Sequence, residues 1–214
     1  VLGRGTLVTH SVPPEGRHLF LEIATAISGI ETKLLRADIS EIGIYPRDRI
    51  SRRSGHPTRV LLDRLSRALG LPEIELVITP NVSRTRVLAQ DGLWVVVPQG
   101  LTALPEPTQL ASLGRALARV ALNVPWLEEL PPPHIEALLI ASARTVNPRY
   151  GTEDVDGLSQ KLVAQYEPNV AKERSRKQKQ LLEKLVPLMN SHAARLVGID
   201  VLIGVRARAE LRIA

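Results

Sequence analysis

The chain has 214 residues, of which 44% are hydrophobic and 23% are charged, a composition typical of a globular protein. It has 28 Lys and Arg against 22 Asp and Glu, a net charge of +6, and no cysteine. These values exclude a disordered chain, a collagen, a coiled coil, thiol catalysis and zinc bound by cysteine. No apolar run approaches the roughly 20 residues that span a bilayer, and the absence of cysteine fits a reducing compartment. We therefore expect a cytoplasmic protein.

The first 45 residues carry no motif that points to a function. Residues 1–18 mix glycine, proline and polar residues and favour a strand followed by a loop, whereas the apolar run 19–30 favours a helix. The chain begins with Val1 and lacks the order of a signal peptide, which indicates a piece of a longer protein or a processed product. Residues 1–45 are thus an N-terminal segment without an assigned role.

A helix and a small sheet are predicted next. Pro57 stands at a favourable first-turn position after the basic loop 45–56, and Gly70 stands where helix C-termini prefer glycine. The apolar spacing between these two residues predicts a helix. Three β-rich runs then predict a three-stranded sheet, with Asp91-Gly92 as the turn of a hairpin. The runs are 74–78, 85–89 and 93–97, and the last is apolar enough to be buried.

The second half of the chain has helical periodicity. An apolar stripe between residues 104 and 121 predicts one helix, and the Ala- and Leu-rich run 134–146 predicts another that is buried on most sides. Two more helices are expected at 155–166 and 170–192, separated by Pro168, with a kink or break at Pro187. A last helical segment is expected at 193–213.

These elements predict a helix-dominated α+β fold. The expected domains are a core at 46–150 and a helical C-terminal extension at 151–214, after the N-terminal segment 1–45.

One stretch carries a more specific pattern. A strand ending in Trp94-Val-Val-Val-Pro-Gln-Gly-Leu101 precedes a helix with Leu113-Gly-Arg-Ala-Leu-Ala-Arg-Val120. This stretch resembles the gluzincin metallopeptidases, in particular the HtpX-like enzymes and the minigluzincins. In those proteins a strand of the form V-V-V-x-x-G-L is followed by a helix carrying L-G-H-E-L-A-H-V. The resemblance implies a zincin-like core, with the small sheet packed on the motif helix.

The resemblance places Arg115 and Arg119 at the positions of the zinc-binding histidines, and Ala116 at that of the general-base glutamate. A guanidinium stays protonated at physiological pH and has no lone pair for a cation, and alanine cannot take a proton from water. The five histidines, at positions 10, 18, 56, 134 and 192, include no pair at ligand spacing. We therefore expect no peptidase activity by this mechanism, no metal and no cofactor.

Two interpretations of the motif helix stay open. Its pattern is also that of any amphipathic helix of Leu and Ala with exposed arginines. If it is peptidase-like, a cleft beside strand 93–97 would take an acidic peptide by β-augmentation, or its arginines would pair internally with carboxylates. The candidate cleft residues are Trp94, Val96, Arg115, Arg119 and Glu136, the last at the place of a third ligand; the candidate internal partners are Glu106, Glu128, Glu129 and Glu136.

Residues 56–188 also resemble the C-terminal part of large myxobacterial tetratricopeptide-repeat proteins. The shared features are Ser-Gly-His-Pro-x-x-x-Leu-x-x-x-Leu at 54–65, Val-Pro-Trp-Leu at 124–127 and Val-Ala-Lys-x-x-Ser-Arg-Lys-Gln-Lys at 170–179. This resemblance implies a non-catalytic, peptidase-like domain that follows the repeats.

Two basic segments suggest a different class of function. They lie at 47–56 and 172–179. Clustered cations contact phosphates or acidic surfaces, although the segment 172–179 contains no aromatic residue on which single-stranded bases would stack. The main hypothesis is therefore an inactive, metallopeptidase-like module that binds a protein or peptide, and the alternative is a polyanion- or nucleic-acid-binding module. The candidate contacts for the alternative are Arg47, Arg49, Arg52, Arg53, Lys172, Arg174, Arg176, Lys177 and Lys179.

Overall fold

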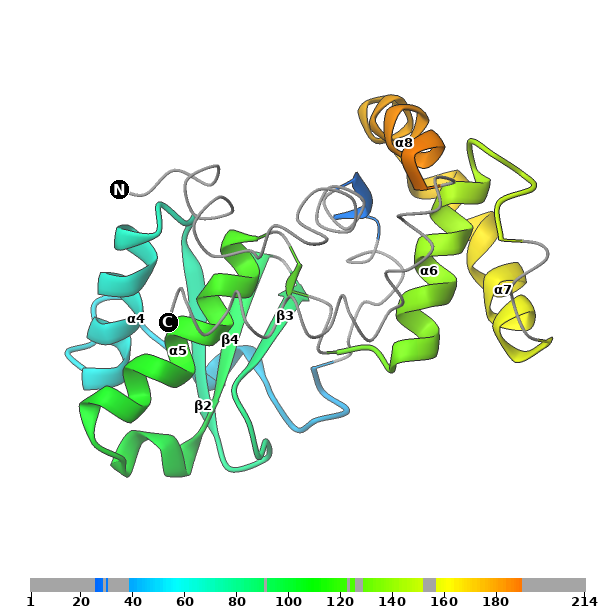
Figure 1. The fold of residues 1–214 in the computed structure, drawn as a ribbon. Helices are drawn as coiled ribbons and strands as arrows, with labels where there is room; N and C mark the ends of the chain where they lie inside the picture. The colour runs from blue at the N-terminus through cyan, green and yellow to red at the C-terminus, as the bar shows by residue number, and fades with distance from the viewer. Residues whose placement is uncertain are drawn as a thin grey trace. The chain divides into compact units, whose positions relative to one another are not determined.

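The computed structural model describes residues 26–28, 30, 39–90, 92–122, 124–125, 129–151 and 157–189. The chain divides into two compact units, one built mainly from residues 36–126 and the other mainly from residues 13–35 and 127–206. Among the described residues the sheet belongs to the first unit, and the second is helical (Figure 1). The boundary between the two units follows residue 126, whereas the core expected from the sequence ends at residue 150. It lies earlier because the helix 132–144 packs on the next helix of the chain.

The sheet of the first unit has four strands in the order β1-β2-β4-β3. Strands β2 and β4 run parallel at its centre, while β1 and β3 pair antiparallel with them at the edges. The three expected strands are present. The expectation of a three-stranded sheet is wrong, because the sheet has a fourth strand, β1, which is too short to show an alternating pattern in the sequence. The strands are β1 (Arg49–Ile50), β2 (Ile74–Thr79), β3 (Arg86–Gln90) and β4 (Gly92–Pro98).

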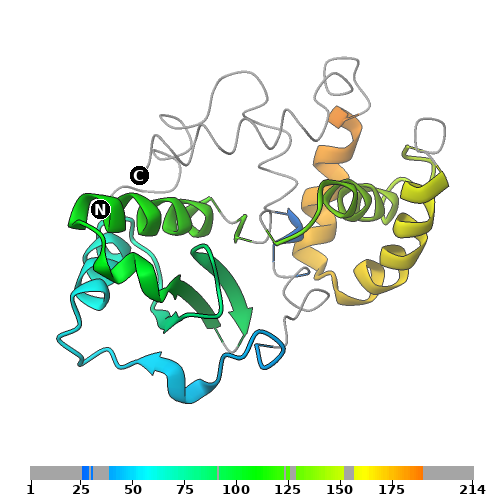
Figure 2. The same cartoon turned by 90° about the horizontal axis from the view of Figure 1, so that it is seen from below.

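Strand β4 is buried on both of its faces. On one face Val95 and Val97 join a hydrophobic cluster with helices α4 (Pro57–Ala68) and α5 (Glu106–Ala121). On the other face Trp94 and Val96 join a second cluster that includes Ile44. Figure 2 shows the sheet between the two helices and the chain segment before α4. Such two-sided burial requires a strand without polar alternation, which the run of three valines provides.

Helix α4 begins and ends where its sequence predicts. Pro57 is its first residue, and Gly70 follows its end with a φ of 64°. The amides of Gly70 and Leu71 donate hydrogen bonds to the carbonyls of Arg67 and Ser66, which is the Schellman arrangement of a helix C-terminus. The glycine is therefore required by the backbone geometry of this helix end.

A buried glutamine fixes the start of helix α5. The side-chain oxygen of Gln109 accepts a hydrogen bond from the Thr58 hydroxyl of α4 at 3.1 Å. Its amide nitrogen donates to the carbonyls of Thr102 and Leu104 at 3.2 and 2.9 Å. These bonds join α5 to α4 and to the 3₁₀ helix η2 (Gln99–Ala103), so the two helices are held together on one face of the sheet.

The second unit contains helices α6 (Pro132–Arg144), α7 (Gly157–Glu173) and α8 (Arg176–Met189). As expected, α6 is buried on most sides, from Ala137 to Ala143. The expected separation of two helices at Pro168 is wrong, because α7 continues through this proline. Helix α8 likewise includes Pro187 and ends at Met189.

Packing explains why α7 tolerates its proline. The buried residues of α7 are Ser159, Val163, Tyr166 and Val170, and their spacing places them on one face. Pro168 lies on the exposed side of the helix. The buried face therefore extends on both sides of Pro168, and its tertiary contacts offset the hydrogen bond that the proline lacks.

The helical structure is interrupted instead at Ser175, between α7 and α8. The Ser175 amide donates to Oε1 of Gln178 at 2.7 Å, and the Gln178 amide donates to Oγ of Ser175 at 3.2 Å. This reciprocal pair is a capping box, which starts a new helix.

The helix-dominated α+β class is confirmed. The predicted elements at 1–18 and 193–213, and most of the helix at 19–30, lie outside the described residues. Within the ranges that the structure describes, no helix is both long enough and apolar enough to cross a membrane.

We predict that Gly70→Ala lowers the free energy of unfolding by about 1 kcal/mol, because alanine resists the left-handed conformation of this residue. Urea unfolding followed by circular dichroism measures the change. Gly55→Ala is the matched control, since Gly55 has no positive φ and no atom within 4 Å of an added Cβ. Equal losses in the two variants would contradict a conformational role for Gly70.

Candidate functional site

The three motif positions of helix α5 lie in different environments. Ala116 is fully buried in the cluster between the helices and the sheet. Arg119 is 3% exposed, whereas Arg115 is exposed to solvent. Residues four apart share a helix face. On this face, however, the part at Arg115 is exposed to solvent and the part at Arg119 is buried. The three positions therefore do not line one accessible surface.

The expected peptide cleft beside residues 93–97 is wrong. Strand β4 is paired along both edges, with β2 on one side and β3 on the other, so it cannot add a further strand. In addition, Trp94 and Val96 belong to the cluster on the sheet face opposite α5. The structure thus separates these two residues from Arg115 and Arg119.

The remaining carboxylates proposed for this site are dispersed. Glu136 is exposed on α6, in the second unit. Glu106 forms an ion pair with Arg64 at 3.0 Å, and Glu128 lies outside the described residues. Neither Arg115 nor Arg119 is without an interaction partner.

Three of the four candidate arginines in the basic loop before α4 contact aromatic rings or carboxylates of the first unit. The guanidinium of Arg47 lies 4.9 Å from the ring centroid of Tyr45, and that of Arg49 lies 5.2 Å from the ring of Trp94. Such contacts are cation–π interactions.

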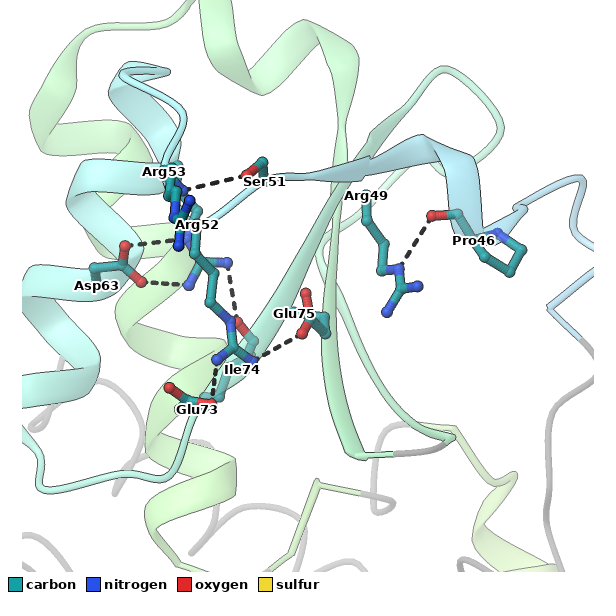
Figure 3. A network of polar contacts seen from close by, with 10 residues as sticks. Pro46, Arg49, Ser51, Arg52, Arg53, Asp63, Glu73, Ile74 and Glu75 are labelled. Carbon is teal, nitrogen blue, oxygen red and sulfur yellow. Dashed lines mark hydrogen bonds and ion pairs between the residues drawn. The ribbon is translucent and has the colours of Figure 1, made fainter.

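Arg52 binds two carboxylates (Figure 3). Its Nη1 pairs with Glu73, and its Nη2 donates to Oε1 of Glu75 at 2.8 Å. The hydrogen bond to Glu73 is the main cause that raises the pKa of Arg52 above its ordinary value, and Glu75 adds to it. Arg53 is exposed, as are the other three candidate arginines of this loop, and its amide donates to Oγ of Ser51 at 3.3 Å.

The second basic segment is also partly engaged. Arg174 donates from Nη1 to the carbonyl of Thr145 at 2.9 Å, which satisfies the C-terminal end of α6. Lys179 pairs with Glu183 at 3.7 Å. Lys172, Arg176, Lys177 and Lys179 are all exposed, and the first three have no ion pair with a described carboxylate. The two basic segments belong to different units, so each is a candidate surface by itself.

A buried arginine, Arg59, is absent from the residues that the sequence singles out. It is 3% exposed. Its Nε donates to Oδ2 of Asp63 at 3.1 Å, its Nη2 pairs with Oδ1 of the same carboxylate, and its Nη1 donates to the carbonyl of Ile74 at 3.0 Å. The network joins α4 to the first residue of β2. Its signal in the sequence is an arginine on the apolar face of a helix, with an acidic residue four positions later.

In the second unit, His134 makes a polar link between two helices. Its Nδ1 lies 2.8 Å from the hydroxyl of Tyr166, and the rings meet edge to face at 6.1 Å. Burial raises the pKa of the Tyr166 hydroxyl. His134 is half-buried and links α6 to α7.

Comparison with protein-family models, curated proteins and solved structures finds no match to this chain. In the described part of the chain, His, Asp and Glu side chains form no group of three that could hold a metal ion. The resemblance to metallopeptidases therefore stays a hypothesis that rests on the pattern of one strand and one helix.

We predict that Asp63→Asn destabilises the protein by about 2 kcal/mol, since it removes the charge that balances the buried Arg59. The value lies below that of a fully buried pair because the side chain of Asp63 is 35% exposed. Chemical unfolding measures it. The double variant Arg59→Met/Asp63→Leu, which leaves no unpaired charge, should lose less stability than Asp63→Asn, and a larger loss would contradict this explanation.

Proposed function

We propose that the chain is a non-catalytic module with a metallopeptidase-like core, which binds an acidic protein or peptide as part of a longer protein. Since the chain has no cysteine, a reducing compartment such as the cytoplasm suits it.

The packing of α5 under the sheet is the observation that carries this proposal. Leu113, Ala116 and Leu117 of α5 pack in one cluster with Val95 and Val97 of β4. This is the arrangement that the resemblance to gluzincins implies for the motif strand and the motif helix. The position of the general base is held by a fully buried methyl group, which can neither take nor deliver a proton.

The binding surface that we propose is the outer face of α5. We define it by Leu104, Thr108, Ala111 and Arg115, which are all exposed. Thr108, Ala111 and Arg115 follow helical spacing and share one side of the helix. Leu104, 45% exposed, supplies an apolar contact just before the helix. A positive group and an apolar group near the two ends of this surface suit an acidic peptide that also carries a hydrophobic residue.

We predict that Arg115→Glu lowers the recovery of binding partners by about tenfold in affinity capture from the source organism, because a positive contact becomes a repulsive one. Quantitative mass spectrometry of the captured proteins measures this. Arg115 is preferable to the buried Arg119, whose replacement by glutamate would also disturb the fold. The matched control is Arg149→Glu, an exposed arginine of the second unit.

Capture that is unchanged in Arg115→Glu would reject the outer face of α5 as the binding surface. The non-catalytic part of the proposal has its own test. Zinc at one equivalent per purified chain, together with peptide hydrolysis that a chelator abolishes, would overturn it.

The alternative, a polyanion-binding module, is favoured by the start of α8. Arg176 and Lys177 are its first two residues and both are exposed, while no acidic residue occupies the first turn. Cations oppose the positive end of the helix dipole. An anion bound at this end would relieve the repulsion between these cations and the helix dipole. The exposed Lys172 of α7 would contribute a further positive charge to that anion site.

We predict for this alternative that any binding to a short DNA duplex weakens steeply with salt. In the variant Lys172→Gln/Arg176→Gln/Lys177→Gln, the slope of log K against log salt should fall by about three, one for each phosphate that the variant no longer neutralises. Fluorescence anisotropy measures it. Lys161→Gln is the control, and an equal slope in the triple variant would exclude this end of α8 as the binding surface.

A further inference from the structure

A pocket of about 310 Å³ lies where α4 ends and β2 begins. Its wall carries three arginines, Arg52, Arg59 and Arg67, against two carboxylates, Asp63 and Glu73. These five lining residues sum to one positive charge, and Arg52 also pairs with Glu75, which is not a lining residue. The pocket volume is at the lower end of the range for small-molecule sites.

One of the positive groups of the pocket, the guanidinium of Arg59, is buried. Arg59 is 3% exposed, and its guanidinium is fixed by Asp63 and by the carbonyl of Ile74. A cation that is held in place before a ligand arrives loses little entropy when the ligand binds.

Two residues that line the pocket carry donors without acceptors in the described part of the chain. Ser66 is 8% exposed, and its Oγ has no hydrogen-bond partner among the described residues. A buried hydroxyl without a partner is costly in a folded protein. Arg67 donates from Nε to the carbonyl of Asp63 at 3.2 Å, and within the described ranges its two Nη groups have no further hydrogen bond. Both residues line the same pocket.

The helix end offers little competition for these donors. The carbonyls of Leu65, Ser66 and Arg67 accept hydrogen bonds from the amides of Leu69, Leu71 and Gly70. The carbonyls that would give this helix C-terminus its negative character are thus largely satisfied by the chain itself.

We propose that this pocket binds the oxyanion of a small molecule, a carboxylate or a phosphate ester. The Nη groups of Arg67 and the hydroxyl of Ser66 donate to its oxygens, and Arg59 supplies the fixed positive charge. Leu71 and Pro72, which also line the pocket, contact the carbon part of the ligand. This site is independent of the outer face of α5 and of the function proposed for it.

The test is a titration of the full chain with inorganic phosphate and, separately, with acetate, at an ionic strength held constant with sodium chloride. Two-dimensional amide NMR follows it. We expect saturable shifts at the amides of Ser66, Arg67 and Leu71. Saturation by phosphate alone assigns a phosphate ester, saturation by acetate alone assigns a carboxylate, and shifts with neither anion would overturn the proposal.

Three variants separate binding from folding. Arg67→Gln should raise the Kd about tenfold, the loss expected for one charge-assisted hydrogen bond, while Lys161→Gln should leave it unchanged. Ser66→Ala should also weaken binding, yet its melting temperature should equal or exceed that of the original protein, because the deleted hydroxyl has no partner within the described chain. A lower melting temperature, or equal weakening in Lys161→Gln, would refute the site.

Discussion

The burial of β4 on both faces is the constraint on which the first unit depends. Val95 and Val97 need an apolar layer on one side, and Trp94 and Val96 need one on the other. The helices α4 and α5 provide the first layer, and residues around Ile44 contribute to the second. Because β4 occupies the centre of the sheet, its hydrogen-bonding edges are consumed by β2 and β3. A strand in this position stabilises the fold and has no free edge for a partner.

The same burial determines what the motif positions can do. Ala116 fills a site against the sheet, where a glutamate would place a carboxylate in an apolar cluster at a large desolvation cost. Arg119 is buried as well, while Arg115 alone of the three is exposed. The chemistry of the side chains and their environment thus agree. The inner positions of α5 support the core, so within this helix a binding function could use the outer face alone.

The parts of this structure that were predictable from the sequence depend on local physics. Gly70 marks a helix end because only glycine adopts its φ easily, and three apolar runs mark strands. Strand order and the central place of β4 depend on long-range pairing, which a single sequence does not encode locally. Pro168 predicts a helix end by its own chemistry, but packing of α7 overrides it, while the capping pair at Ser175 is a local signal for the true break. Arg59 has a local signal in Asp63, four residues later, but its bond to the carbonyl of Ile74 depends on how α4 packs on β2.

Three arginines of this protein bind main-chain oxygens, which changes how its net charge should be interpreted. Arg59 binds the carbonyl of Ile74, Arg144 binds that of Tyr150 at 2.9 Å, and Arg174 binds that of Thr145. In each case a guanidinium donates to a main-chain oxygen: Ile74 is the first residue of β2, Thr145 follows the end of α6, and Tyr150 lies in the turn after α6. A guanidinium has five donors and can do this while also pairing with a carboxylate, as Arg59 does with Asp63 and Arg144 does with Glu167. A carboxylate partner, as at Arg59 and Arg144, offsets the charge that a distant polyanion would meet, so the excess of basic residues is weaker support for nucleic-acid binding than the composition suggests.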